Sequence, residues 1–330
     1  MAIGLAIGAA FVALFLRLIN VSSASRRLEH LNVGLAVLCG VVFLSAYCVR
    51  AMRWRTFLAP DKVTIRRAIR IYFIAVFLNW GLPVQGGELA KSLVLRRTNG
   101  IPVNRSFAAV TMDKAMDLLP AIVLVALLPL AHQHLSQPLW IVLIFVLIVL
   151  GVGALSLCLA SWRQARTSAF LSRLLAVILP RRIRERAEPF VVGFIDALLA
   201  LARRPRLLLI GAAYTALAVT LDALFCFLAF RAVGVSVGFL VVLYGYTFYN
   251  LAYILPTPPG HLGSNELVGL LIFAGVLHMN RSAVGAMFLF SHPLTGVLLT
   301  VCGLACLKGI GLKLHTTLAM RSDAEPIGDR

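Results

Sequence analysis

The chain has 330 residues, of which 60% are hydrophobic and 13% are charged, and its formal net charge is +18. A soluble domain carries about a quarter charged residues, so this composition excludes a soluble protein and predicts an integral membrane protein. The basic residues lie between apolar runs, and no nucleic-acid-binding motif accompanies them. We therefore interpret the charge as membrane topology and contact with anionic lipid headgroups, and we expect no nucleic-acid partner.

Six apolar runs are long enough to cross a bilayer, which takes about 20 mostly apolar residues. They are residues 2–19, 32–51, 106–131, 138–160, 207–231 and 283–307. The first run has no basic start, so we expect an uncleaved span; the sequence SSA after it leaves cleavage open as the alternative. Gly4 and Gly8 in this run form a GxxxG pair, which indicates close helix packing.

Two further apolar regions, near residues 69–97 and 237–278, are interrupted by clusters of proline and glycine. Neither half of either region is long enough to cross the membrane. Irregular backbone is tolerated at membrane depth only where it is buried in protein or faces water. We therefore predict two re-entrant hairpins of broken helices. For the second hairpin, which contains PTPPGHLGSNE, a solvent loop is the alternative.

The two interrupted regions share one ordered series of residues. Each runs from an asparagine to a proline, a glycine break, a glutamate and a second short helix; the residues are Asn79, Pro83, Gly86, Gly87 and Glu88 in the first, and Asn250, Pro256, Gly260, Gly263 and Glu266 in the second. An Asn-Arg-Ser sequence then opens the next span, at 104–106 and at 280–282, with side chains suited to capping a helix. The series predicts repeats over 53–131 and 237–307 within a single transmembrane domain, 1–330.

The distribution of basic residues predicts the orientation of the chain. Arginine and lysine concentrate in segments 50–70 and 161–206 and in the C-terminal tail, which places both termini in the cytoplasm. The first hairpin then enters from the cytoplasm and the second from outside, which is an inverted repeat. In transporters, such repeats place paired broken helices around a substrate site near the midplane. The fold class expected is thus an all-α polytopic membrane protein with about six full spans and two re-entrant hairpins.

The segment 161–206 is the one sizeable piece predicted to lie in the cytosol. Its sequence AEPFVVGFIDALLALARRPR is typical of an amphipathic helix on the inner leaflet, with arginines near anionic headgroups. A basic connector without that role is an equal alternative.

Six charged residues fall in or beside the apolar spans: Glu88, Asp113, Lys114, Asp117, Asp222 and Glu266. A charge at the bilayer centre costs roughly 2.5–3.5 kcal/mol on insertion scales. Asp113 and Asp117 share one helix face, and Lys114 can form a structural ion pair with Asp117. The remaining carboxylates suggest a site for a cation, a proton or a zwitterionic headgroup, while Asp222 is left open between a structural and a functional role.

Other polar residues carry weaker signals. His261 and His292 lie near the second hairpin, and the sequence leaves open whether they pack as hydrogen-bonded residues or relay protons. Arg53, beside Trp54, is interpreted as an anchor at the membrane interface. No cysteine belongs to a CxxC pair, so we expect neither disulfides nor a metal site, and no catalytic or cofactor motif is evident.

Several of these motifs resemble the lysylphosphatidylglycerol synthase transmembrane region, a flippase-like family with many stand-alone members, some of them associated with hopanoid biosynthesis. The resemblance covers nearly the whole chain and rests on RW at 53–54, N…LP…GGE at 79–88, MDKAMD at 112–117 and LPTPPGHLGSNE at 255–266. The chain departs from the family pattern in having Lys91, Asp113 and Lys114 where arginine, glutamate and arginine are usual. The sign of each charge is kept, but bidentate binding of phosphate through arginine is lost.

The resemblance implies a lipid translocase of the bacterial inner membrane that moves a polar-headgroup, polyprenyl or hopanoid lipid. Glu88 and Glu266 would line a midplane cavity with Asn79 and Asn250. Headgroup or proton contacts would come from Lys91, Asp113, Lys114, Asp117, His261 and His292, and recruitment of anionic lipid from Arg53, Arg96 and Arg97. These residues contain no soluble aminoacyltransferase domain, so we expect no enzyme activity and no cofactor. The alternatives are an ion-coupled small-solute transporter and a membrane scaffold for a lipid-synthesis enzyme as partner.

Overall fold

The computed structural model describes residues 2–81, 86–120, 137–162, 173, 181–251 and 258–311, and all regular structure within them is helical, as predicted. The predicted turn residues Pro83 and Pro256 lie outside these ranges. The long helices are α1 (Ala2–Leu18), α2 (Val21–Glu29), α3 (Val33–Phe57), α4 (Ile65–Gly81), α5 (Gly87–Asn99), α6 (Val103–Met116), α8 (Gln137–Trp162), α10 (Arg181–Ala202), α11 (Pro205–Ala232), α12 (Phe239–Leu251) and α14 (Arg281–Ile310).

Three of the described helices, α3, α11 and α14, are long and apolar enough to cross a membrane. A fourth span is added if α1 and α2, which are bent by 88° relative to each other, are counted as one broken span. Helix α8 coincides with another predicted run, whereas the run predicted at 106–131 begins as α6 and continues beyond the described residues. A multi-pass membrane protein is therefore supported, and the count of six spans stays a prediction.

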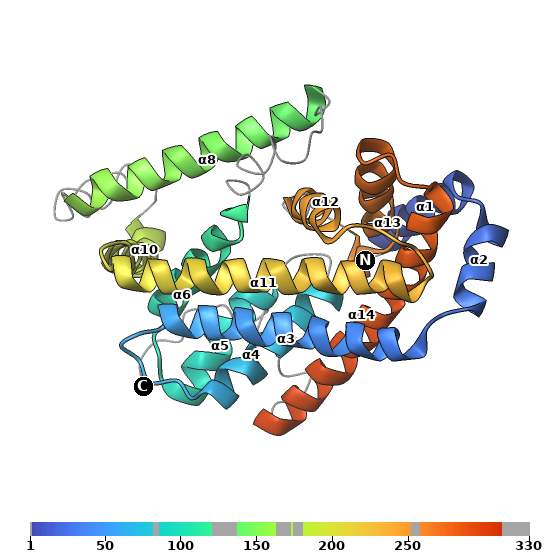
Figure 1. Ribbon diagram of the computed structural model, residues 1–330. Helices are drawn as coiled ribbons and strands as arrows, with labels where there is room; N and C mark the ends of the chain where they lie inside the picture. Colours follow the sequence, from blue (N-terminus) through green and yellow to red (C-terminus); the bar gives the residue numbers. More distant parts are fainter. Residues whose placement is uncertain are drawn as a thin grey trace.

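Helices α3 and α11 lie side by side, and α14 crosses them (Figure 1). Glycines bring the helices close at these crossings. A Cβ on Gly211 of α11 would lie 2.5 Å from the Phe57 ring of α3. Where α14 meets α4, a Cβ on Gly303 would lie 2.4 Å from Cβ of Phe77. Because lipid tails are as apolar as the side chains, such close van der Waals packing holds membrane helices together.

Both interrupted regions form a helix, a break and a second helix. In the first region, α4 ends at Gly81 and α5 begins at Gly87. In the second, α12 ends at Leu251, and helix resumes through the short 3-10 turn η2 (Pro259–His261), α13 (Ser264–Gly269) and the π-helical η3 (Leu270–Val276). Gly263, just before α13, has a φ of +73°, which glycine adopts without strain.

The first helix packs against the tip of the second hairpin. A Cβ on Gly4 would lie 3.0 Å from Cδ of Pro259, and one on Gly8 would lie 3.4 Å from Cβ of Pro258. The GxxxG pair thus makes the close contact that was predicted. Its partner is the turn of the hairpin rather than a long helix.

The two Asn-Arg-Ser sequences differ in how they begin the following helix. Asn280 caps α14, its side chain accepting a hydrogen bond from the Ala283 amide at 3.1 Å. In the first repeat the expectation of an equivalent cap was wrong, because α6 already begins at Val103 and Asn104 lies within its first turn. Helix α10 forms within the predicted segment 161–206 and packs on α6, with Phe194 against Phe107.

Candidate functional site

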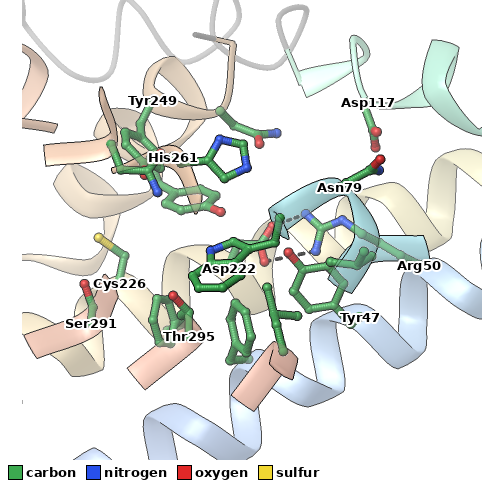
Figure 2. A pocket seen from close by; sticks show the side chains of 18 of the residues that line it. Tyr47, Arg50, Asn79, Asp117, Asp222, Cys226, Tyr249, His261, Ser291 and Thr295 are labelled. Carbon is green, nitrogen blue, oxygen red and sulfur yellow. Dashed lines mark hydrogen bonds and ion pairs between the residues drawn. The ribbon is translucent and has the colours of Figure 1, made fainter. Parts of the chain in front are cut away.

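A cavity of about 680 Å³ lies between the two hairpins and helices α3, α6, α11 and α14 (Figure 2). The first hairpin contributes Asn79 and Glu88 to its wall, and the second hairpin contributes Asn250 and His261. Four further charged side chains and a histidine also line the wall: Arg50, Lys114, Asp117, Asp222 and His292. Residues predicted from both hairpins are thus brought to one cavity.

Arg53 binds two carboxylates, of which Asp117 borders the cavity. Its Nε lies 2.7 Å from Oδ1 of Asp113, its Nη2 lies 2.6 Å from Oδ1 of Asp117, and its Nη1 donates to Oγ1 of Thr215 at 2.9 Å. The side chain is 1% exposed. The expectation of an interfacial anchor was therefore wrong: the fork of guanidinium donors matches two carboxylates that lie one turn apart on α6.

Glu88 connects two lysines. Its Oε2 lies 2.9 Å from Nζ of Lys91, and its Oε1 lies 3.1 Å from Nζ of Lys114. Lys91 also lies 3.7 Å from Oδ2 of Asp113 and 4.0 Å from the centre of the Tyr72 ring, an additional cation–π contact. The predicted pair between Lys114 and Asp117 is present at 3.7 Å, although Lys114 lies closer to Glu88.

We call these side chains the charge network: Arg53, Lys91 and Lys114 with Glu88, Asp113 and Asp117. Its three cations and three anions balance, which offsets part of the cost of burying them. Arg53, Lys91 and Asp113 are at most 1% exposed, whereas Lys114 is 44% and Asp117 is 32% exposed. The network therefore offers one ammonium group and one carboxylate to a ligand in the cavity.

Asn79 holds the first hairpin together. Its Nδ2 donates to Oε1 of Glu88 at 3.0 Å, and its Oδ1 accepts from the backbone N–H of Gly87 at 2.7 Å. Gly87 has no room for a side chain, since a Cβ would lie 1.9 Å from the Ala75 carbonyl oxygen. Glu88 lies in the first turn of α5, where the helix dipole favours a negative charge.

Glu266 and His292 meet in the second hairpin. Glu266 lies in the first turn of α13, and its Oε1 contacts Nδ1 of His292 on α14. The other imidazole nitrogen, Nε2, lies 2.8 Å from the carbonyl oxygen of Gly260 at the tip of the hairpin. Both side chains are nearly buried, and His292 borders the cavity.

The pair of Arg50 and Asp222 was not foreseen from the sequence. Nη1 of Arg50 lies 3.1 Å from Oδ1 of Asp222, and a second ion-pair contact joins the two groups (Figure 2). The pair joins α3 to α11 across the cavity wall. The sequence did contain a signal that Arg50 has a buried acidic partner, because Arg50 and Arg53 lie three residues apart on one face of an apolar helix.

Two predicted recruitment residues lie away from the cavity, whereas three predicted turn glycines lie in the hairpin breaks. Arg96 and Arg97 are exposed at the far end of α5 from Glu88 and do not border the cavity, so lipid recruitment by them stays a prediction. Gly86, Gly260 and Gly263 lie in the breaks of the two hairpins, where they were expected.

Residues 1–303 match the family described as the lysylphosphatidylglycerol synthase TM region, and the chain belongs to this family. It is 25% identical over 248 residues to a UPF0104 membrane protein of Methanothermobacter thermautotrophicus, covering 68% of this chain and 70% of the relative. It is also 25% identical over 293 residues to a UPF0104 membrane protein of Pyrococcus horikoshii, covering 82% of this chain and 85% of the relative. No solved structure matches the chain.

Proposed function

We propose that the protein is a lipid translocase whose substrate headgroup passes through the cavity between the two hairpins. The observation that carries this proposal is that one cavity is bordered by both hairpins and by the two accessible members of the charge network, Lys114 and Asp117. An ammonium and a carboxylate side by side suit a headgroup that bears a phosphate, an amine or both.

The rest of the wall favours a lipid over a soluble solute. Large apolar side chains line the cavity together with the charged ones, among them Phe43, Trp80, Phe225, Met287 and Phe288. A wall that mixes large apolar surface with a few placed polar groups suits a ligand with both a polar head and an apolar body.

The inverted repeat is part of the same proposal, and the helix contacts support it. Helix α3 packs on α4 as α11 packs on α12, and α5 packs on α6 as α13 and η3 pack on α14. Two related halves that face each other would allow the cavity to open alternately to either side of the membrane.

The first test is the lipid content of the purified protein. In native-lipid nanodiscs analysed by mass spectrometry, we expect one lipid class to be enriched over the bulk membrane. Removal of one charged hydrogen bond costs about 1.5–3 kcal/mol, so Lys114→Gln and Glu88→Gln should reduce this enrichment about tenfold.

Glu29→Gln is the matched control, because Glu29 is exposed on α2 and far from the cavity wall. It should retain the enriched lipid. Bulk lipid composition in all four proteins would contradict the translocase. Uptake of a soluble zwitterion into liposomes without lipid movement would instead support the solute transporter.

A further inference from the structure

His292 connects two parts of the second hairpin from its position in the middle of α14. Its Nε2 lies 2.8 Å from the Gly260 carbonyl oxygen, and its Nδ1 contacts Oε1 of Glu266. A carbonyl oxygen has no proton to give, so Nε2 must carry the proton and donate it to Gly260. The contact with Gly260 therefore determines which nitrogen is left to face Glu266.

The contact between Nδ1 and Glu266 then requires one proton. An imidazolium can donate to a carboxylate, or a carboxylic acid can donate to a neutral imidazole; either state is neutral overall and holds one proton in the contact. Without that proton, a nitrogen lone pair faces a negatively charged oxygen and the two groups repel each other. The second oxygen of Glu266, Oε2, is buried and makes no hydrogen bond within the described residues, so the carboxylate depends on this contact.

The first hairpin is built differently. Glu88 is contacted by the ammonium groups of Lys91 and Lys114 and by the amide of Asn79. An ammonium group and an amide each carry their own donor hydrogens, so these contacts do not require an additional shared proton. The two hairpins thus carry glutamates at corresponding positions, of which the second is held by a histidine through a contact that needs a shared proton.

Other charged and titratable side chains border the same cavity as His292, among them Glu88, Lys114 and Asp117 of the charge network. His261 of η2 lies at the same tip and borders this cavity, and the pair of Arg50 and Asp222 lines it as well. Helices α1 and α4 contact the tip through glycines and Trp80. Since His292 borders the cavity, its proton can pass to water there.

We propose that Glu266 and His292 form a proton-binding site that holds the second hairpin against α14, and that release of the proton frees the hairpin. Coupling of lipid movement to proton uptake and release at this site rests on the proposed function. The proton-dependent contact itself does not rest on it.

Hydrogen–deuterium exchange of the full protein in nanodiscs tests the contact without a transport assay. Between about pH 5 and pH 9, with labelling times scaled to the intrinsic exchange rate, peptides covering 258–276 should lose about tenfold or more of their protection as the proton leaves. The Glu266→Gln variant should keep its protection at every pH, because the glutamine amide does not titrate and can donate a hydrogen bond to Nδ1. His292→Gln should show low protection without pH dependence.

Glu29→Gln and His30→Gln are the matched controls, since both residues are exposed on or next to α2, and both variants should titrate like the wild type. Protection that does not change with pH in the wild type would overturn the proposal. The same conclusion would follow if Glu266→Gln and His292→Gln both titrated like the wild type.

A liposome assay with fluorescent phosphatidylglycerol and phosphatidylethanolamine as probes separates the contact from the translocase. Probe movement that an imposed pH gradient accelerates, and that Glu266→Gln makes insensitive to the gradient, would support the coupling. Probe movement at the same rate with and without the gradient would overturn the coupling and leave the translocase in place. Absence of probe movement together with a pH-dependent hairpin would contradict the translocase for these lipids and uphold the proton site.

Discussion

Arg53 illustrates how a charged side chain is accommodated in a membrane helix. An unpaired cation in a bilayer is costly, and long basic side chains therefore often extend to the interface. Arg53 is instead buried, because Asp113 and Asp117 on α6 and Thr215 on α11 occupy its donors. Its guanidinium group connects α3 to α6 and α11. The positions of its donor nitrogens therefore matter as much as its charge.

Replacement of Arg53 by lysine should therefore destabilise the protein although the charge is kept. A single ammonium group cannot reach both carboxylates and Thr215, so at least one charged hydrogen bond is lost. We expect a decrease of about 2 kcal/mol or more in the free energy of unfolding, measured by denaturation in detergent. The same change at Arg66, which is exposed on α4, should leave stability within about 0.5 kcal/mol. Equal stability of the two variants would contradict the role assigned to Arg53.

At the scale of the elements, the two broken helices position the two glutamates. Each break brings a glutamate into the first turn of a short helix, and in each the glutamate is tied back by a nitrogen-bearing side chain, Asn79 in one and His292 in the other. The second break is also held from outside by α1. A Cβ on Gly263 would lie 2.4 Å from Cβ of Phe11, so the approach of α1 requires glycine there.

Gly263→Ala should therefore weaken the second hairpin. The substitution combines a positive φ with a clash against Phe11, and it should cost more than about 1 kcal/mol. Gly275→Ala, in the same hairpin, is the control, because its Cβ would meet its nearest atom at an ordinary 3.7 Å. Thermal unfolding of both variants measures the difference. A Gly263→Ala variant as stable as Gly275→Ala would argue against the close packing of α1 on the hairpin.

At the scale of the whole molecule, α3 and α11 form the pair of long helices around which both hairpins are arranged (Figure 1). The cavity lies where the hairpins, α6 and α14 meet this pair. Helix α11 has 28 residues and therefore a length of about 42 Å, enough to cross the bilayer with its two ends on opposite sides.

The distribution of basic residues predicts that the N-terminal end of α11, which adjoins the basic segment 161–206, faces the cytoplasm. A cysteine introduced at exposed Arg206 should react with a membrane-impermeant maleimide only after cell lysis, whereas one at exposed Ser236 should react in intact cells. The unmodified chain, with its natural cysteines, is the background control. The opposite pattern of labelling would reverse the proposed orientation and, with it, the sides from which the two hairpins enter.

The sequence by itself determined the class of protein, the helical fold and the positions of both breaks. These features follow from local properties: apolar runs of sufficient length, and prolines and glycines that interrupt helical hydrogen bonding. The shared series of Asn79 to Glu88 and Asn250 to Glu266 likewise indicated that both hairpins belong to one site. Their glycines lie in the breaks that the structure describes.

Only the tertiary structure decided how the charges are paired between helices, whereas the pair of Lys114 and Asp117 within one helix end was predicted from its spacing. Arg53 contacts a carboxylate 60 residues away, Arg50 contacts one 172 residues away, and His292 contacts one 26 residues away. Such partners depend on how each helix is rotated and how closely glycines let the helices approach, and neither property is contained in a single segment. A charged residue in an apolar run therefore signals that a partner exists, whereas the packing of the helices determines which residue it is.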